Sequence, residues 1–558
     1  MMKKERFLAI ISINGVFNGQ KYGKGVKKNE LESILMRFYT RRYMRSVSLP
    51  GFFSVLPTAV AYRRIGWLFT VAWGAFIVFR RLLREGMWAD GLTYAALSRN
   101  MAIGKGSFWS PVFASSFWLP FNQTETFYEH PPLLFYIQSW FFRLLGDTYV
   151  TERVYCLVML LLILFLMVQL WRQLVPTDHP MYRWEWLPVF LLFTFPLTEW
   201  TYAQNYLDVT MSLFCLLTVK YTIEGWQNPK RWFPMATLAV LALLAAFLTK
   251  GPVSLHVLAV PGLYGLFCFP TPELGKATRW TFLLIGGFAL LLSLLLLYEP
   301  ARIFLHTYFN QQVWAALNGK REVYGDTSGS LGRTFIVKVL LTNLAPALVL
   351  LAVLWLLNRF WLKSREAIRP LSGMIRFYIA LGLASTLPIM ATTKQIEYYI
   401  VPALPYMALG LGAWIGPQLV KLTFRLPKTS LRIFLALGWM ACLGSGVYGI
   451  SIAGTPYHSH RAILADVHTI GSVVPSNTRL GVCPEMMASV LLHSYLQRYH
   501  RLEMTTLAKK PVYFLADPTC RDAQHPQLTA AGYQPVAVSM KSYVLYHRPA
   551  PPVSTKRL

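Results

Sequence analysis

Charged side chains are scarce in this sequence. Only 14% of the 558 residues are Asp, Glu, Lys or Arg, and 54% are hydrophobic, whereas a soluble domain carries about a quarter charged residues. Nearly uncharged runs follow one another in tandem, among them residues 154–170, 235–248, 282–297 and 337–357. Each approaches the length that crosses a bilayer core. A soluble core could hide one such helix but not this many, so the composition predicts an integral membrane protein.

Acidic residues are the scarcer charge, with 25 against 54 Lys and Arg and a net charge of +29. Such an excess would fit a nucleic-acid-binding protein. The sequence has no Cys-rich zinc spacing, however, and no basic stripe interleaved with aromatics outside the apolar runs. In a polytopic protein the same excess holds cytoplasmic loops in place. We therefore expect a lipid bilayer as the partner, and no nucleic acid.

Cysteine is also rare, with six residues. Four lie in apolar runs and are expected to be small buried hydrophobic residues: Cys156, Cys215, Cys268 and Cys442. Cys483 and Cys520 lie in the C-terminal segment, which the topology below places outside the cytoplasm, where a disulfide can form.

A cleaved signal peptide is lacking as well, because no apolar run with a small-residue cleavage site lies near the start. Residues 1–65 are polar and basic, with Lys and Arg recurring throughout. We interpret them as a cytoplasmic leader that is partly disordered, and Met44 is an alternative start.

The apolar runs predict about eleven transmembrane helices. Their ranges are 66–83, 153–171, 186–201, 205–224, 232–248, 252–270, 281–299, 334–357, 374–392, 397–416 and 431–453. With the N-terminus inside, the cytoplasmic connections are rich in Lys and Arg, whereas the first outer loop, 84–152, holds six acids. This bias obeys the positive-inside rule. An odd number of spans then places the C-terminus outside.

Residues 454–558 differ from the rest of the chain. Short β-like runs at 479–483, 511–516 and 543–547 alternate with helical patterns at 461–470 and 486–495. The alternation predicts a small α/β extracytoplasmic domain with a loose C-terminal end.

Several ionisable residues fall on the predicted outer surface of the membrane. Asp90 opens an amphipathic helical pattern in the first loop, where Glu129 and His130 also lie. Asp208 begins the fourth span. Outer turns carry the remaining members, Lys250, Lys394 and Glu397. Each has a purely structural interpretation, such as helix capping for the acids or snorkelling for the lysines.

Their convergence favours a site. Charges beside hydrocarbon are costly unless they are paired or functional. A carboxylate can act as a general base toward an acceptor hydroxyl while cations hold a phosphate. No nucleotide or redox cofactor is needed for that chemistry. A divalent metal stays open, since no clear ligand set is evident.

Four segments resemble, in order, motifs of the GT-C glycosyltransferases related to lipid A aminoarabinose transferase and protein O-mannosyltransferases. Residues 90–101 resemble a first-loop motif of Asp-Glu followed by Tyr, small residues, Arg and Met. Residues 128–132 (Tyr-Glu-His-Pro-Pro) are similar to Tyr-Glu-Lys-Pro-Pro, and 248–253 match the pattern Leu-Thr-Lys-Gly-Pro. Residues 394–405 resemble Lys…Tyr-Leu-Leu-Pro-x-Leu-Pro. The resemblance covers roughly residues 66–453.

This resemblance implies a polyprenyl- or dolichyl-phosphate sugar donor and an inverting transfer. Asp90 would match the catalytic Asp, and Glu129 would assist it. Lys250, with Lys394 or Tyr398, would match residues that hold the lipid phosphate. Two departures are Gly91 in place of Glu and His130 in place of Lys, and both bear on the acceptor and the pH dependence rather than on the class.

The sequence thus predicts a multi-pass glycosyltransferase of a bacterial-type inner membrane whose active site faces outward. Asp90 and Glu129 are its candidate catalytic residues; His130, Asp208, Lys250, Lys394, Glu397 and Tyr398 are its candidate substrate-binding residues. A transporter or flippase for a lipid-linked oligosaccharide is the main alternative, although it would place polar residues at mid-membrane. A non-catalytic assembly or sensor protein that binds through its tail is a third. The sugar, the acceptor and the oligomeric state are not specified by the sequence.

Overall fold

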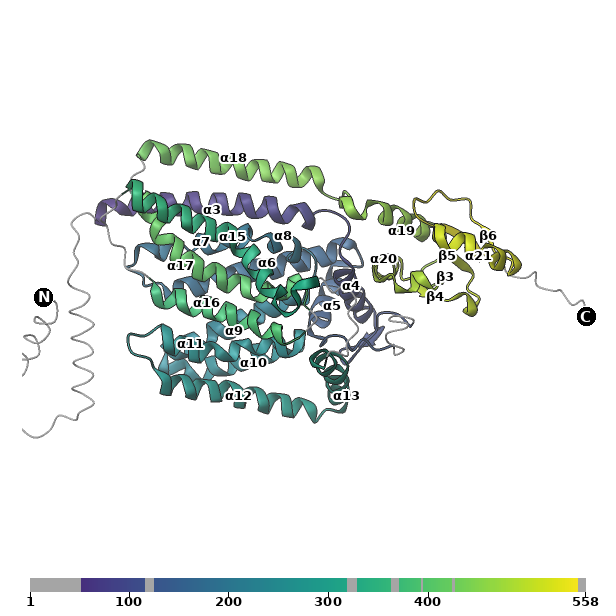
Figure 1. The fold of residues 1–558 in the computed structure, drawn as a ribbon, viewed down its shortest axis with the longest axis horizontal. Coiled ribbons are helices and arrows are strands. Elements are labelled where there is room, and N and C mark those ends of the chain that lie inside the picture. The colour runs from purple at the N-terminus through teal and green to yellow at the C-terminus, as the bar shows by residue number, and fades with distance from the viewer. Residues whose placement is uncertain are drawn as a thin grey trace, which may run out of the picture. The chain divides into compact units, whose positions relative to one another are not determined.

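The computed structural model describes residues 52–115, 125–318, 329–362, 371–392, 395–423 and 427–549 (Figure 1). The chain divides into two compact units, Met1–Val60 and Ala61–Leu558. Of the first unit, only the beginning of helix α3 (Phe52–Leu82) is described. Residues 1–51 of the predicted leader lie outside the described ranges. The last fourteen residues of the predicted leader, 52–65, are helical, because α3 begins before the apolar run that starts at residue 66.

Helices occupy each of the eleven predicted ranges. After α3, these helices are α6 (Tyr149–Leu174), α7 (Trp186–Thr194), α8 (Pro196–Thr201), α9 (Leu207–Gln227), α10 (Trp232–Lys250), α11 (Val260–Phe267), α12 (Leu274–Leu296), α15 (Phe335–Leu356), α16 (Ser372–Thr386), α17 (Leu404–Thr423) and α18 (Lys428–Ile452). Tighter 3₁₀ turns extend several of them: η3 (Gly251–Ala259), η7 (Leu387–Ala391) and η8 (Glu397–Ala403).

Eight helices of the described ranges are long and apolar enough to cross a membrane. One of them, Pro229–Phe267, joins two predicted spans through η3. The ranges 186–201 and 205–224 are helical but are not among the eight. In the first, Phe195 is extended before Pro196, because a residue that precedes proline avoids helical geometry. The count of eleven spans therefore stays a prediction.

Burial separates central helices from peripheral ones. The most apolar stretch of Glu397–Thr423, which comprises η8 and α17, is 89% buried, whereas the corresponding stretches of α12 and α18 are 11% and 17% buried. Large apolar side chains on the outer helices are exposed, such as Phe282 at 69% and Ile450 at 80%. An apolar surface of this extent would be unstable in water and suits lipid. The chain is a multi-pass membrane protein.

The connections hold further helices, α4 (Ala89–Ala102), α5 (Leu133–Leu145), α13 (Glu299–Tyr308) and α14 (Ala315–Leu317), and the hairpin of β1 (Gly106–Ser107) and β2 (Ser110–Pro111). The predicted amphipathic helix is α4. Apart from Asp90, its polar residues do not face water, however. Thr93, Ser98 and Asn100 are at most 2% exposed, since α4 packs against α5 and also against helix α20 of the tail.

The tail forms a five-stranded sheet with helices. Its elements are α19 (Arg461–Val473), β3 (Arg479–Val482), α20 (Val490–His500), β4 (Glu503–Thr505), β5 (Tyr513–Ala516), α21 (Pro518–Ala530), β6 (Gln534–Pro535) and β7 (Val544–His547). The strand order is β4-β3-β5-β7-β6. Strand β3 pairs in parallel with β4 and β5, and β7 is antiparallel to β5 and β6. The predicted small α/β domain is confirmed.

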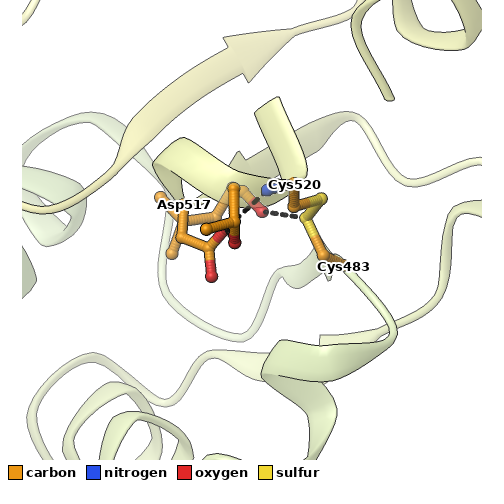
Figure 2. The surroundings of a disulfide bond; sticks show 5 residues. Cys483, Asp517 and Cys520 are labelled. Carbon is orange, nitrogen blue, oxygen red and sulfur yellow. Dashed lines mark hydrogen bonds between the residues drawn. A yellow bond between two sulfur atoms is a disulfide. The ribbon is translucent and has the colours of Figure 1, made fainter. Parts of the chain in front are cut away.

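A disulfide joins Cys483, which follows β3, to Cys520 in the first turn of α21, with the Cα atoms 6.3 Å apart. Figure 2 shows that Asp517 caps the same turn: its Oδ1 accepts a hydrogen bond from the Cys520 amide at 2.8 Å. An Asp cap followed by Pro518 is a strong helix start. The disulfide fixes that start to the sheet.

Replacing Cys483 and Cys520 by Ser is expected to destabilise the tail. The bonded cysteines are 37 positions apart, and closing such a loop is worth roughly 4 kcal/mol in the chain-entropy model. The rate of proteolysis of the tail in the full-length reconstituted protein measures the loss. Cys442→Ser serves as the control, because that thiol is not in a disulfide. Equal proteolysis of all three proteins would contradict the prediction.

Candidate active site

Helix ends meet at one place, and each carries a predicted site residue. Asp90 lies in the first turn of α4 and Asp208 in the first turn of α9. Lys250 is the last residue of α10, and Tyr398 lies in the first turn of η8. Acids at helix N-termini and a lysine at a C-terminus also suit the helix dipoles. Polar side chains are thereby concentrated where apolar segments end.

Lys250 and Asp208 form a buried ion pair. The Nζ of Lys250 lies 2.5 Å from Oδ1 of Asp208, and the side chains are 9% and 3% exposed. The ammonium also lies over the rings of Tyr398 and Tyr399, at 5.3 and 4.6 Å from their centroids. A buried charge needs such compensation. One carboxylate and two aromatic rings therefore fix the position of the lysine.

Asp90 contacts the same tyrosine. The Tyr398 hydroxyl donates a hydrogen bond of 2.9 Å to Oδ2 of Asp90. The Tyr398 ring stacks on Tyr206, with centroids 4.4 Å apart, and Trp200 lies edge-on to both rings. Stacked and edge-on aromatic contacts of this kind hold a ring firmly. The hydroxyl of Tyr398 thus contacts Asp90, and the face of its ring contacts Lys250.

Glu129 and His130 lie beside Tyr94 of α4, which connects them to the group of Asp90, Asp208, Lys250 and Tyr398. The Tyr94 and His130 rings are 5.8 Å apart and nearly perpendicular. Burial raises the pKa of the Tyr94 hydroxyl well above its ordinary value, and the charges of Asp90, Asp208 and Glu129 raise it further. Three carboxylates from three segments therefore act on one hydroxyl, which stays protonated and able to donate.

Two polar atoms of this group are buried without a hydrogen-bond partner among the described residues: Oδ2 of Asp208 and the hydroxyl of Tyr206. Buried polar atoms in native proteins are nearly always hydrogen-bonded. An unsatisfied acceptor beside a fixed ammonium suits a polar ligand.

One predicted residue, Glu397, is not brought into the group, and another cannot be placed there. Glu397 is exposed and, within the described ranges, has no hydrogen bond or ion pair. It precedes Tyr398 in a 3₁₀ helix, where neighbouring residues point about 120° apart. Lys394 lies outside the described residues. A substrate-binding role for either stays a prediction.

The aromatic lining was not identified from the sequence. Tyr399 and Tyr206 lie beside predicted residues and could have been suspected for that reason. Nothing in the sequence pointed to Tyr308 of α13. Its hydroxyl donates a hydrogen bond to the Lys250 carbonyl at 3.3 Å. Gly251 has φ +76°, and a Cβ there would lie 2.1 Å from that hydroxyl. The glycine after Lys250 is therefore required by this close approach.

Helix α20 of the tail holds α4 from the side. The hydroxyls of Thr93 and Ser494 lie 2.8 Å apart. Further along, Arg99 donates through Nη2 to the Gln497 carbonyl at 2.8 Å. Because Asp90 is on the same short helix as Thr93 and Arg99, the tail contributes to its position.

A buried ionic network supports this contact. Arg498 of α20 pairs with Glu152 at 2.8 Å and with Asp147 at 2.7 Å, and Asp147 also pairs with Arg99 and Arg501. Burial lowers the pKa of Arg99 to about 10. Burial alone would raise the pKa of Asp147, but the three guanidinium groups outweigh it and lower that pKa. Arg99 and Asp147 are therefore both charged at neutral pH.

The described residues contain no group of three or more His, Cys, Asp or Glu positioned to hold a metal ion. The acids of the site are engaged by Lys250 and Tyr398 instead. The arrangement therefore offers a carboxylate, a fixed ammonium and aromatic surface at one membrane boundary.

Comparison with known proteins bears on the fold. No protein-family model and no curated protein sequence match the chain. The structure is similar to that of ArnT from Cupriavidus metallidurans bound to undecaprenyl phosphate, with a TM-score of 0.54 and 16% identity over 89% of this chain and 98% of that one. The apo state of the same ArnT matches with a TM-score of 0.53 and 17% identity over the same shares of the two chains. The fold expected from the four motifs is confirmed, since the chain shares the membrane fold of this ArnT.

Proposed function

We propose that this protein is a glycosyltransferase that moves a sugar from a polyprenyl-phosphate carrier, of the undecaprenyl or dolichyl type, to an acceptor hydroxyl, with inversion at the anomeric carbon. The contact of Tyr398 with both Asp90 and Lys250 carries the proposal. Through this contact Tyr398 links a candidate general base, Asp90, to a candidate phosphate-binding cation, Lys250. The fold shared with an ArnT that binds undecaprenyl phosphate supports the donor class.

The reaction requires few groups. Asp90 takes the proton of the acceptor hydroxyl while the oxygen of that hydroxyl attacks the anomeric carbon. The bond from that carbon to the phosphate oxygen breaks on the opposite side, and polyprenyl phosphate leaves with the electron pair. Lys250 stabilises the negative charge that develops on the phosphate. The protonated Tyr94 hydroxyl is a further donor beside the reacting groups, and Glu129 assists the proton transfer.

The charge bias of the loops supports an outward-facing location for the site. Connections predicted to be cytoplasmic are basic, and the site lies at the other ends of the helices. A disulfide in the tail suits an oxidising compartment. We infer that the site faces the outside of a bacterial-type inner membrane, where the acceptor is a lipid, a protein or a glycan.

Transport of a lipid-linked oligosaccharide is the competing function. It predicts movement of the intact lipid across the bilayer without a new glycosidic bond. Polar residues of a transporter concentrate near the midplane, whereas here they collect at helix ends. A liposome assay that scores lipid translocation and sugar transfer in parallel separates the two.

Neutralising the ion pair tests the phosphate-binding role. The double change Asp208→Asn with Lys250→Gln leaves no buried charge unpaired. Loss of one charge-assisted contact, worth about 1.5–3 kcal/mol, should weaken binding of polyprenyl phosphate by roughly 10- to 150-fold. Lys276→Gln, on a partly exposed lysine at the far end of α12, is the control. Unchanged affinity in a folded double variant would exclude this role.

Tyr398→Phe tests the role of the hydroxyl separately from that of the ring. The stacking on Tyr206 and the contact with Lys250 remain, but the hydrogen bond to Asp90 is lost. A bond to a charged acceptor is worth about 1.5–3 kcal/mol, so the transfer rate should fall by roughly 10- to 150-fold. Steady-state rates with a labelled donor measure this. Tyr221→Phe, near the other end of α9, should behave as wild type, and an equal effect of both changes would count against the prediction.

A further inference from the structure

The tail contains a cleft that the transferase chemistry does not use. Its volume is about 600 Å³, within the range of roughly 300–1,000 Å³ typical of small-molecule sites. Segments from β3, η11 (Leu507–Lys509), β5, α21 and the end of β7 surround it. Of the described residues that line it, two are cations, Lys510 and Arg548, and none is an acid.

Arg548 is fixed in position at one wall. Its Nη2 donates to the Lys510 carbonyl at 2.6 Å, and its guanidinium lies 5.5 Å from the centroid of the Tyr533 ring. Tyr533 is itself buried, and its hydroxyl donates to the Pro511 carbonyl. A guanidinium anchored on one edge and on one face keeps its remaining N–H groups oriented for an anion.

The other wall is α21, which presents Gln524 and Gln527. Carboxamides donate and accept hydrogen bonds, as recognition of sugar hydroxyls requires. The disulfide fastens this wall to the sheet, because Cys520 lies one turn before Gln524 and Cys483 directly precedes the lining residue Pro484 (Figure 2). The two walls are therefore held at a fixed spacing.

We propose that this cleft binds an anionic saccharide, with Lys510 and Arg548 on its phosphate or carboxylate group and Gln524 and Gln527 on its hydroxyls. A free anion would use the cations alone, whereas the amides on the facing wall match a larger polyhydroxylated ligand. The proposal stands on the tail alone and does not rest on the transferase function. Binding here and transfer at Asp90 can therefore fail separately.

The test uses the full-length protein in nanodiscs and measures binding of trehalose 6-phosphate, trehalose and inorganic phosphate by calorimetry at two salt concentrations. We expect saturable binding of the phosphorylated disaccharide that weakens with salt, at least tenfold tighter than either other probe. Lys510→Gln with Arg548→Gln should weaken it at least tenfold. Gln527→Ala, on an exposed side chain, should weaken it severalfold and provides a second variant if the double change disturbs folding.

Lys509→Gln is the matched control, since Lys509 is an exposed neighbour that does not line the cleft. Its affinity should stay within twofold of wild type. Equal binding of trehalose would overturn the role of the cations, and equal binding of inorganic phosphate would overturn the role of the amides. No saturable binding of the phosphorylated disaccharide, or equal effects of Lys509→Gln and the double change, would overturn the site.

Discussion

Asp90→Asn is expected to lower the rate of sugar transfer by about two to four orders of magnitude, the usual contribution of a positioned general base. Asparagine keeps the size of the side chain and can still accept a hydrogen bond from the Tyr398 hydroxyl, now 2.9 Å from Oδ2. It cannot take the proton of the acceptor. The local structure should therefore persist while the chemistry fails.

Two measurements keep this prediction specific. Binding of polyprenyl phosphate to Asp90→Asn should stay within a few-fold of wild type, because Lys250 and Asp208 are unchanged. Asp178→Asn, an exposed acid on a connection far from the site, should transfer normally. If folded Asp90→Asn protein transfers at the wild-type rate, Asp90 is structural and the proposed base is wrong.

The second large effect is expected at Arg498. Its side chain is 3% exposed and pairs with Glu152, which is 2% exposed. Arg498→Ala leaves that carboxylate buried without its partner, a change that costs about 3–5 kcal/mol. The contact between α20 and α4 should loosen, and the tail should become sensitive to protease. Thermal unfolding of the reconstituted protein measures the stability loss.

Arg501 provides the matched control. It pairs with Asp147 of the same network, but its side chain is 35% exposed, so Arg501→Ala should cost no more than about 1 kcal/mol. Transfer should also fall in Arg498→Ala, since α4 carries Asp90. A stability loss at Arg498 no larger than that at Arg501 would show that the network does not hold the tail to the loop.

The fold could be predicted because its signals are local. Apolar runs of bilayer length and basic loops are visible without knowing any contact. The tail strands β3, β5 and β7 were found for the same reason, whereas β4 and β6 have only three and two residues and give no pattern. The number of spans could not be predicted in the same way. Hydropathy does not reveal where an apolar run is divided into short helices such as α7 and α8.

The candidate site was predictable in part. Asp90, Asp208 and Lys250 were identified from their place at span ends, and the structure brings them together. Arg498 was not, because its partner Glu152 is 346 positions away and an arginine within a polar tail pattern resembles an ordinary surface residue. Tyr308 was missed for a similar reason. Pairings that depend on the docking of the tail or of α13 are set by tertiary structure alone.

The central claim is that this group of residues transfers a sugar from a lipid carrier. The most direct test compares cells that carry wild type or Asp90→Ala at matched membrane expression, and measures their lipid-linked sugars and envelope glycans. We predict that one polyprenyl-phosphate sugar accumulates in the mutant while one glycan loses the same sugar. Unchanged lipid and glycan profiles, with the variant present in the membrane, would contradict the account.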